Sequence, residues 1–413
     1  MVIRKDRLDL YLLLISLSVW QMNAFGSDTR IFVSVFCGAC VLLDILQRGN
    51  IAKNPAKILL PLILIILIGS VSYINESDNI SLHNYLRDMY YITPVCLMFY
   101  QGFILSSKYS KKDICSIVVW ANMISTINHF IKVLLNIQYI TSLNYLRTEC
   151  GALSHLNVIA LIIVMFGDDY ISERIKRHRL TFIASFIISE VLYFSRTGML
   201  AIAVFVVIIY IMKHRTIVLR SLKVLLLLGI CVLIVYFTNP NIVDSFVEKI
   251  NYTLIEIGVG NNTTVSSSDM MFREREIVQA KREFEEGTLI NKAIGYGIGH
   301  NIKLGDSGYK INIDGEEFTE AGMIHNGYYK ALSISGIIGL ILFVYFHINI
   351  VIYAWVNRKF MSETDFRFIL SIIAVLLITA YTVIGIYAKG SNYPYIIALT
   401  AIIYGNKDIE EAI

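Results

Sequence analysis

The chain has 413 residues, of which 56% are hydrophobic and only 16% are charged. A soluble globular domain carries about 25% charged residues, so this composition, with a mean hydropathy of +0.61, excludes a soluble or disordered protein. The formal net charge of +4 is small. No clustered basic face accompanies it, so no nucleic acid is expected as a partner.

Apolar runs recur along most of the chain and predict about twelve membrane-spanning helices, because a bilayer needs roughly 20 apolar residues per span. The first run resembles a signal peptide but lacks a small-residue cleavage site, so we expect an uncleaved first span. A β-barrel would show short alternating segments instead. The predicted spans lie near residues 8–25, 30–46, 58–74, 89–106, 114–135, 153–167, 180–195, 197–212, 224–237, 328–355, 368–386 and 393–405.

The charged connections between these runs predict an orientation. Lys and Arg gather in alternate connections, and the positive-inside rule places such connections in the cytoplasm. Both termini are therefore expected to be cytoplasmic. The predicted fold is an all-α polytopic membrane protein in three parts, with transmembrane helices 1–9 in residues 1–237, a large extracytoplasmic loop in 238–322 and transmembrane helices 10–12 in 323–413.

The outer loop contains two recognisable elements. The segment MMFREREIVQAKREFEEG carries acidic and basic residues at helical spacing and predicts a charged helix. Gly295, Gly297 and Gly299 follow it, but His300 stands where a GxGxxG nucleotide loop needs its third glycine, so that reading is excluded. Glycines at this spacing allow the backbone to approach a ligand or a neighbouring helix.

The loop ends at His325-Asn326-Gly327, immediately before an apolar helix. A titratable side chain at such a position is a candidate functional group, because an imidazole can act as a general base near neutral pH. The alternative is an interfacial histidine bonded to a carbonyl group. His300 and Glu320 are secondary candidates in the same loop.

Several arginines fall on the predicted outer face. Arg196 lies in Ser-Arg-Thr-Gly between two spans, where its planar guanidinium can bind phosphate or can simply cap the end of a span. Arg273 and Arg275 lie on the predicted loop helix, and Arg147 lies in another outer connection. For the loop pair, a solvated helix face is the alternative interpretation.

Polar residues also occur at the outer ends of two predicted spans. His155 and Asn157 can line a cavity or can join helices through hydrogen bonds. Glu190 is costly to bury without a partner, and we expect it to neutralise an outer arginine such as Arg196. The chain has no HExxH motif and no outer acidic cluster, so no metal site is predicted.

Four short motifs occur in a fixed order, namely GALSHLNVIA, SRTGMLAIAVFVV, AIGYGIGHN and IHNGYYKALSISGIIGLILFVYF. Together they resemble the Wzy/O-antigen-ligase superfamily of bacterial membrane glycosyltransferases, over roughly residues 145–350. The first motif departs from the family pattern, because Leu156 stands where proline is common.

The resemblance implies a fold of about twelve helices in the bacterial cytoplasmic (inner) membrane, with the outer loop lying over a cavity. It implies a glycan donor linked to undecaprenyl pyrophosphate, no nucleotide, no metal and no other cofactor. Partners beyond the lipid bilayer would be a chain-length regulator and a flippase. The expected catalytic residues are His325, Arg196 and Arg273, and the expected substrate-binding residues are Arg275, Arg147, Asn326, Gly297, His155 and Asn157.

Three activities fit this reading to different degrees. A polymerase would add the growing chain to a new lipid-linked repeat unit of lipopolysaccharide or capsule, whereas an O-antigen ligase would move the finished glycan onto lipid A core. The weak subfamily motifs favour the polymerase. A lipid-linked oligosaccharide flippase also fits about twelve spans, but transporters place their sites at the midplane, whereas here the polar residues gather on one face.

Overall fold

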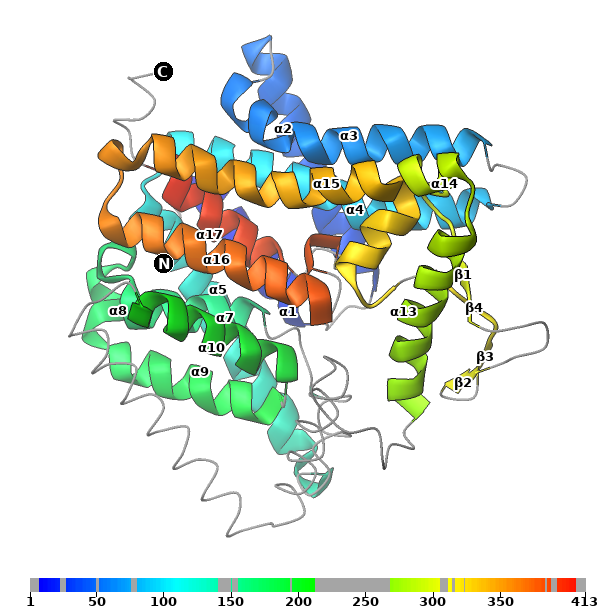
Figure 1. Ribbon diagram of the computed structural model, residues 1–413. Coiled ribbons are helices and arrows are strands. Elements are labelled where there is room, and N and C mark those ends of the chain that lie inside the picture. The colour runs from blue at the N-terminus through cyan, green and yellow to red at the C-terminus, as the bar shows by residue number, and fades with distance from the viewer. Residues whose placement is uncertain are drawn as a thin grey trace.

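The computed structural model describes a predominantly helical protein (Figure 1). The ninth expected span and the first part of the outer loop lie outside the described residues. The residues described are 7–22, 27–49, 52–75, 80–139, 150, 155–193, 195–211, 268–304, 311–313, 316–322, 324–382, 385–387 and 392–405.

Each of the other eleven expected spans coincides with a helix. These helices are α1 (Leu8–Met22), α2 (Ser27–Arg48), α3 (Lys53–Asn75), α4 (Leu82–Lys108), α5 (Lys111–Leu135), α7 (His155–Phe166), α9 (Arg179–Tyr193), α10 (Arg196–Ile211), α15 (Gly327–Val356), α16 (Glu363–Thr382) and α17 (Tyr393–Tyr404). Among the described residues, five helices (α3, α4, α5, α15 and α16) are long and apolar enough to cross a membrane. The structure is thus that of a helical membrane protein, while the full count of twelve spans stays a prediction.

The centre of the bundle consists of helices with no polar face. Every residue of α7 and of α17 is buried, as expected for helices that are hydrophobic all round. Helix α17 packs against α4, and α7 packs against α5 and α9. Each has 12 residues and is therefore only about 18 Å long. Protein rather than lipid surrounds these helices, so their length need not match the bilayer.

Charged contacts collect at one end of the bundle, which we call the basic end. Lys111 at the start of α5 pairs with Asp365 at the start of α16, with 2.8 Å between the charged atoms. Arg7, just before α1, pairs with Asp113 at 3.6 Å, and Gly405 after α17 lies against Lys111. The first and last described residues of the chain therefore lie at the same end of the bundle.

The outer-loop elements occupy the opposite end, which we call the loop end (right in Figure 1). Helix α13 (Ser268–Glu286) coincides with the charged helix predicted from the sequence, and the short α14 (Leu289–Ile294) follows it. Two small antiparallel ladders come next, β1 (Ile302–Lys303) with β4 (Glu320–Ala321), and β2 (Ile311–Ile313) with β3 (Glu316–Phe318). These strands were not among the elements predicted from the sequence.

Helix α15 is broken near its first third. Gly336 has φ 64° and ψ −160°, outside the helical region, so the carbonyl groups of the preceding turn lack their intrahelical donors. The backbone N–H of Tyr296 donates to the carbonyl oxygen of Ser333 at 2.9 Å, and that of Gly297 donates to Ile334 at 3.2 Å. The loop segment after α14 thus supplies the hydrogen bonds that the broken helix loses.

The glycine-rich part of that segment, residues 295–299, forms a wedge between helices. Gly295, Gly297 and Gly299 have φ values of 78°, 103° and 92°, which L-residues with a side chain rarely adopt. A Cβ on Gly297 would lie 2.5 Å from the backbone nitrogen of Tyr73 in α3. The sequence left open whether these glycines let the backbone approach a ligand or a neighbouring helix. In the structure, they let it approach neighbouring helices.

This geometry predicts that Gly297→Ala destabilises the protein strongly. The left-handed backbone alone costs about 1–2 kcal/mol, and overlap with a helix backbone adds about 1–3 kcal/mol. Gly49→Ala is the matched control, because Gly49 has φ 68° with nothing within 4 Å of an added Cβ. Thermal unfolding of the purified protein in detergent measures both. Equal losses of melting temperature for the two variants would show that the wedge is not tightly packed.

Candidate active site at the start of α15

The start of α15 is held by Asn326. Its side-chain oxygen accepts the backbone N–H groups of Tyr328 at 3.0 Å and Tyr329 at 3.2 Å, as an N-cap residue does. Its side-chain nitrogen donates to the carbonyl oxygen of Tyr381 at the end of α16, at 3.2 Å. Asn326 is only 1% exposed. Its side chain therefore fixes the backbone next to His325, and both of its polar atoms are already bonded within the protein.

His325 and Glu276 form the central pair of the site. Both oxygens of the Glu276 carboxylate lie near Nδ1 of His325, at 2.9 and 3.2 Å. The backbone N–H of His325 also donates to Glu276, at 2.9 Å. The Glu276 side chain is fully buried, whereas 28% of the His325 side chain is exposed. A carboxylate on the loop helix thus holds an imidazole at the point where the chain enters the bundle.

This pairing decides which nitrogen of the ring can do chemistry. An ionised carboxylate only accepts hydrogen bonds, so Nδ1 of His325 is the donor in this contact. In the neutral ring the lone pair then resides on Nε2. A carboxylate that holds the ring through Nδ1 in this way fixes the orientation of the imidazole, as general-base catalysis requires.

Of the four arginines expected at the site, Arg275 has a described side chain and the other three do not. Arg275 precedes Glu276 on α13 and is partly buried. Arg196 is the first residue of α10. Because α9 starts at the basic end, where Arg179 pairs with Asp168, the α9–α10 connection belongs to the loop end. The side chains of Arg196 and Arg273, and all of Arg147, lie outside the described residues.

A buried charge cluster lies one turn into α15. Nζ of Lys330 is 2.6 Å from Asp88 in α4, and Nε of Arg87 is 3.0 Å from the same carboxylate. Asp88 also accepts the backbone N–H of Gly299 at 3.2 Å, while Lys330 donates to the carbonyl oxygen of Gly322 at 2.9 Å. The cluster therefore ties α4, the wedge and the end of the outer loop to the helix that carries His325.

A second histidine–glutamate pair holds α13 further along. Nε2 of His300 is 2.9 Å from Glu283, and the ring of Tyr296 stacks on His300 with centroids 4.6 Å apart. Glu320, named as a secondary candidate, is exposed and accepts from Asn301 at 3.2 Å. Glu276 and Glu283 are seven residues apart, so they lie on one face of α13.

The polar residues of α7 join helices. Asn157 donates to Glu190 in α9 at 2.7 Å and accepts from Asn122 in α5 at 2.9 Å. Glu190 thus accepts a hydrogen bond from an amide. Its expected pairing with Arg196 stays a prediction, because the Arg196 side chain lies outside the described residues. His155 is buried with its ring edge toward Tyr395, 5.7 Å between centroids. The described contacts of His155 and Asn157 are thus with α5, α9 and α17, and not with the segment that carries His325.

Sequence reasoning missed three residues of this region, Glu276, Asp88 and Lys330. Lys330 carried a usable signal, because a lysine one turn inside an apolar helix must find a partner. Asp88 follows Arg87 near the start of another span, where two adjacent opposite charges do not indicate burial. Glu276 sits in a run of alternating charges, where nothing in the sequence distinguishes the one carboxylate that becomes buried.

No group of three or more histidine, cysteine or acidic side chains within the described ranges could hold a metal ion.

Comparison of the sequence with protein-family models finds no match, and comparison with curated proteins finds none either.

The charge cluster yields a stability prediction. Lys330→Met leaves the buried Asp88 carboxylate with one partner fewer, and breaking a buried pair costs about 3–5 kcal/mol. Combining Lys330→Met with Asp88→Asn is expected to recover part of that loss, because the buried carboxylate is removed and the charge that remains, on Arg87, is partly exposed. Lys112→Met is the control, since its pair with Glu173 at 3.3 Å is exposed and such pairs contribute about 0–1 kcal/mol. Thermal unfolding in detergent compares the variants, and a Lys330→Met protein as stable as Lys112→Met would contradict the assignment.

Proposed function

We propose that the chain is a Wzy-type polysaccharide polymerase, a glycosyltransferase that joins undecaprenyl-pyrophosphate-linked oligosaccharide repeat units on the outer face of the bacterial cytoplasmic membrane. The observation that carries this proposal is the His325–Glu276 pair. It supplies an oriented imidazole where the outer loop meets the bundle. The four sequence motifs that resemble the superfamily include the segment that begins with this histidine.

The proposed topology has about twelve spans with both termini in the cytoplasm. It is supported by the basic end, where Arg7, Lys111 and Gly405 lie together. Basic residues collect on the cytoplasmic side of membrane proteins. On this orientation His325 and α13 lie outside the cell membrane, where lipid-linked repeat units would be presented to them.

The proposed chemistry is a single displacement at the anomeric carbon of the donor sugar. Nε2 of His325 accepts the proton of the acceptor hydroxyl, whose oxygen forms the new bond to the anomeric carbon. The bond from that carbon to the phosphate oxygen breaks, and undecaprenyl pyrophosphate leaves with the electron pair. Arginines stabilise the charge that develops on it, and we assign this role to Arg196 together with Arg273 or Arg275. The anomeric configuration would invert, and a product that retains it would contradict this mechanism.

Glycan chain length in cells provides the main test. His325→Ala should reduce polymerisation by about 10²–10⁴-fold, the usual contribution of a general base, and Arg196→Ala should reduce it comparably. Gel analysis of surface glycans from complemented deletion strains measures the effect, with protein levels checked by immunoblot. Normal chains in both variants, at normal protein level, would remove the proposed site.

The two histidine–glutamate pairs of α13 allow a matched comparison. Glu276→Gln should slow transfer by up to about 10²-fold, because a misplaced catalytic group loses its alignment with the substrate. Glu283→Gln alters the same kind of pair two turns away, which does not include His325, and should leave most activity intact. Turnover of lipid-linked repeat units by purified protein measures both rates. A larger loss for Glu283→Gln than for Glu276→Gln would contradict the assignment.

The same strains separate the alternatives. Loss of a polymerase leaves single repeat units on the acceptor, whereas loss of a ligase accumulates lipid-linked polymer. A flippase would show no glycosyl transfer in detergent, where no gradient exists. The chain-length regulator and the flippase of the same pathway remain proposed partners, and the reaction as proposed uses no cofactor.

A further inference from the structure

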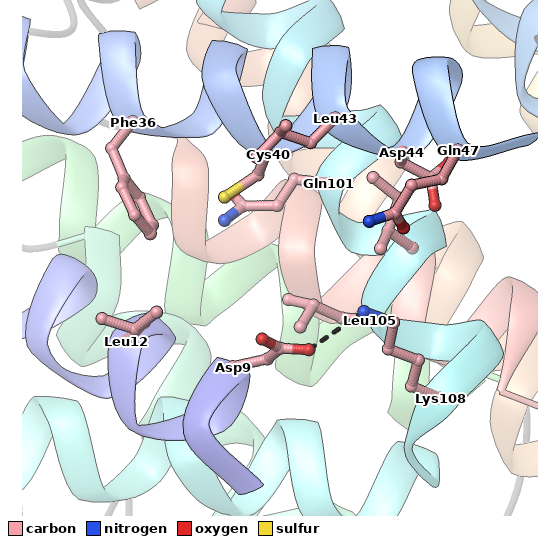
Figure 2. A pocket seen from close by; sticks show the side chains of 11 residues that line it. Asp9, Leu12, Phe36, Cys40, Leu43, Asp44, Gln47, Gln101, Leu105 and Lys108 are labelled. Carbon is pink, nitrogen blue, oxygen red and sulfur yellow. Dashed lines mark hydrogen bonds and ion pairs between the residues drawn. The ribbon is translucent and has the colours of Figure 1, made fainter. Parts of the chain in front are cut away.

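A cavity of about 190 Å³ lies at the basic end of the bundle, whereas His325 lies at the loop end. Figure 2 shows the side chains that line this cavity. The cavity is lined by residues of α1, α2 and α4 and is open on one side. Its position follows from Asp9 in the first turn of α1 and Lys108 in the last turn of α4. Sites for whole organic ligands measure about 300–1,000 Å³, so this cavity fits a headgroup and not a complete lipid.

The polar lining of the cavity carries both signs of charge. Nζ of Lys108 lies 3.1 Å from the Asp9 carboxylate, and both side chains are partly exposed, 51% and 40% respectively. Asp44 contributes a second carboxyl group from α2, across the cavity, with Gln47 one turn further along the same helix. The partly exposed pair of Lys108 and Asp9 presents one charge of each sign, which suits a zwitterion better than a simple anion.

At the floor of the cavity, hydrogen bonds hold the side-chain amide of Gln101 in one orientation. The side-chain oxygen of Gln101 accepts from the hydroxyl of Tyr393 at 2.7 Å and from Sγ of Cys37 at 3.0 Å. With its oxygen held by these two donors, the amide presents its nitrogen to the cavity, near Cys40 (Figure 2). Gln101 is 6% exposed. A buried side chain oriented in this way offers a hydrogen-bond donor to a ligand oxygen.

The surroundings of the cavity are apolar. Leu43 lines the cavity itself, and on α2 the side chains of Phe32, Leu42 and Leu46 are 68%, 57% and 68% exposed. Exposed apolar side chains of this kind suit contact with the hydrocarbon of a membrane. A ligand whose polar part fills the cavity can therefore extend an apolar part along α2.

We propose that this cavity binds the headgroup of a phospholipid that carries both a phosphate and a primary amine, as in phosphatidylethanolamine. Lys108 and the Gln101 amide contact the phosphate oxygens, and the Asp9 and Asp44 carboxyl groups accept hydrogen bonds from the ammonium. A choline headgroup has no N–H donors for those carboxyl groups, and a glycerol headgroup brings no positive charge. The site is independent of the proposed glycosyl transfer, since it lies at the other end of the bundle.

Cys40 offers a native probe, because it lines the cavity and is partly exposed there. The full-length protein is placed in nanodiscs of phosphatidylcholine alone, or with added phosphatidylethanolamine or phosphatidylglycerol. Maleimide labelling of Cys40 is followed by peptide mass spectrometry, with Cys96, which does not line the cavity, as internal reference. At a lipid concentration ten times the Kd, the cavity is empty about one-tenth of the time. Labelling of Cys40 should therefore slow about ten-fold with phosphatidylethanolamine.

Two test variants, one control variant and one soluble ligand complete the test. Lys108→Met and Asp44→Asn should each abolish the protection, whereas Lys112→Met, which alters a lysine at the same end but outside the cavity, should keep it. Protection by soluble glycerophosphoethanolamine would show that the headgroup suffices, and protection by the lipid alone would show that acyl chains contribute. Equal Cys40 labelling in all three lipids, or equal protection by phosphatidylglycerol, would overturn the proposal without bearing on the transferase.

Discussion

The break in α15 is the constraint on which the loop end depends. Inside a bilayer each backbone N–H and carbonyl group needs a partner within the protein, so a helix can be interrupted only where other backbone replaces the lost bonds. Tyr296 and Gly297 make that replacement at Ser333 and Ile334. Because the donors come from the outer loop, the loop is attached to the bundle by main-chain bonds as well as by side chains.

This attachment determines where α13 can lie. The wedge of residues 295–299 is fixed against α3, α4 and α15, and α14 connects it to α13 within a few residues. Among the described side chains of α13, Ala280 makes an apolar contact near Ile302 and Ile324. Polar pairs add to the docking, and one of them places Glu276 against His325. The orientation of the imidazole is thus a consequence of helix architecture more than of local sequence.

The sequence predicted the parts of this structure that depend on hydropathy and periodicity. Apolar runs located the helices, and charges at helical spacing located α13, because both properties are local. The break at Gly336 lies in SISGIIG, which reads as an uninterrupted apolar helix. Its cause is the wedge, some forty residues earlier in the chain. The partners Asp88–Lys330 and Glu276–His325 are likewise set by tertiary packing, which no single stretch of sequence encodes.

Buried and exposed charge pairs have different roles in this bundle. Around His325 at the loop end, Asp88, Glu276 and Lys330 are all 3% exposed or less. Each has its partners in the protein, as burial requires. At the basic end pairs such as Asp9–Lys108 stay partly exposed and are weak in themselves. Buried pairs fix geometry, which a site for bond-breaking chemistry needs. Exposed pairs can exchange partners at little cost, which is what recognition of a charged headgroup requires.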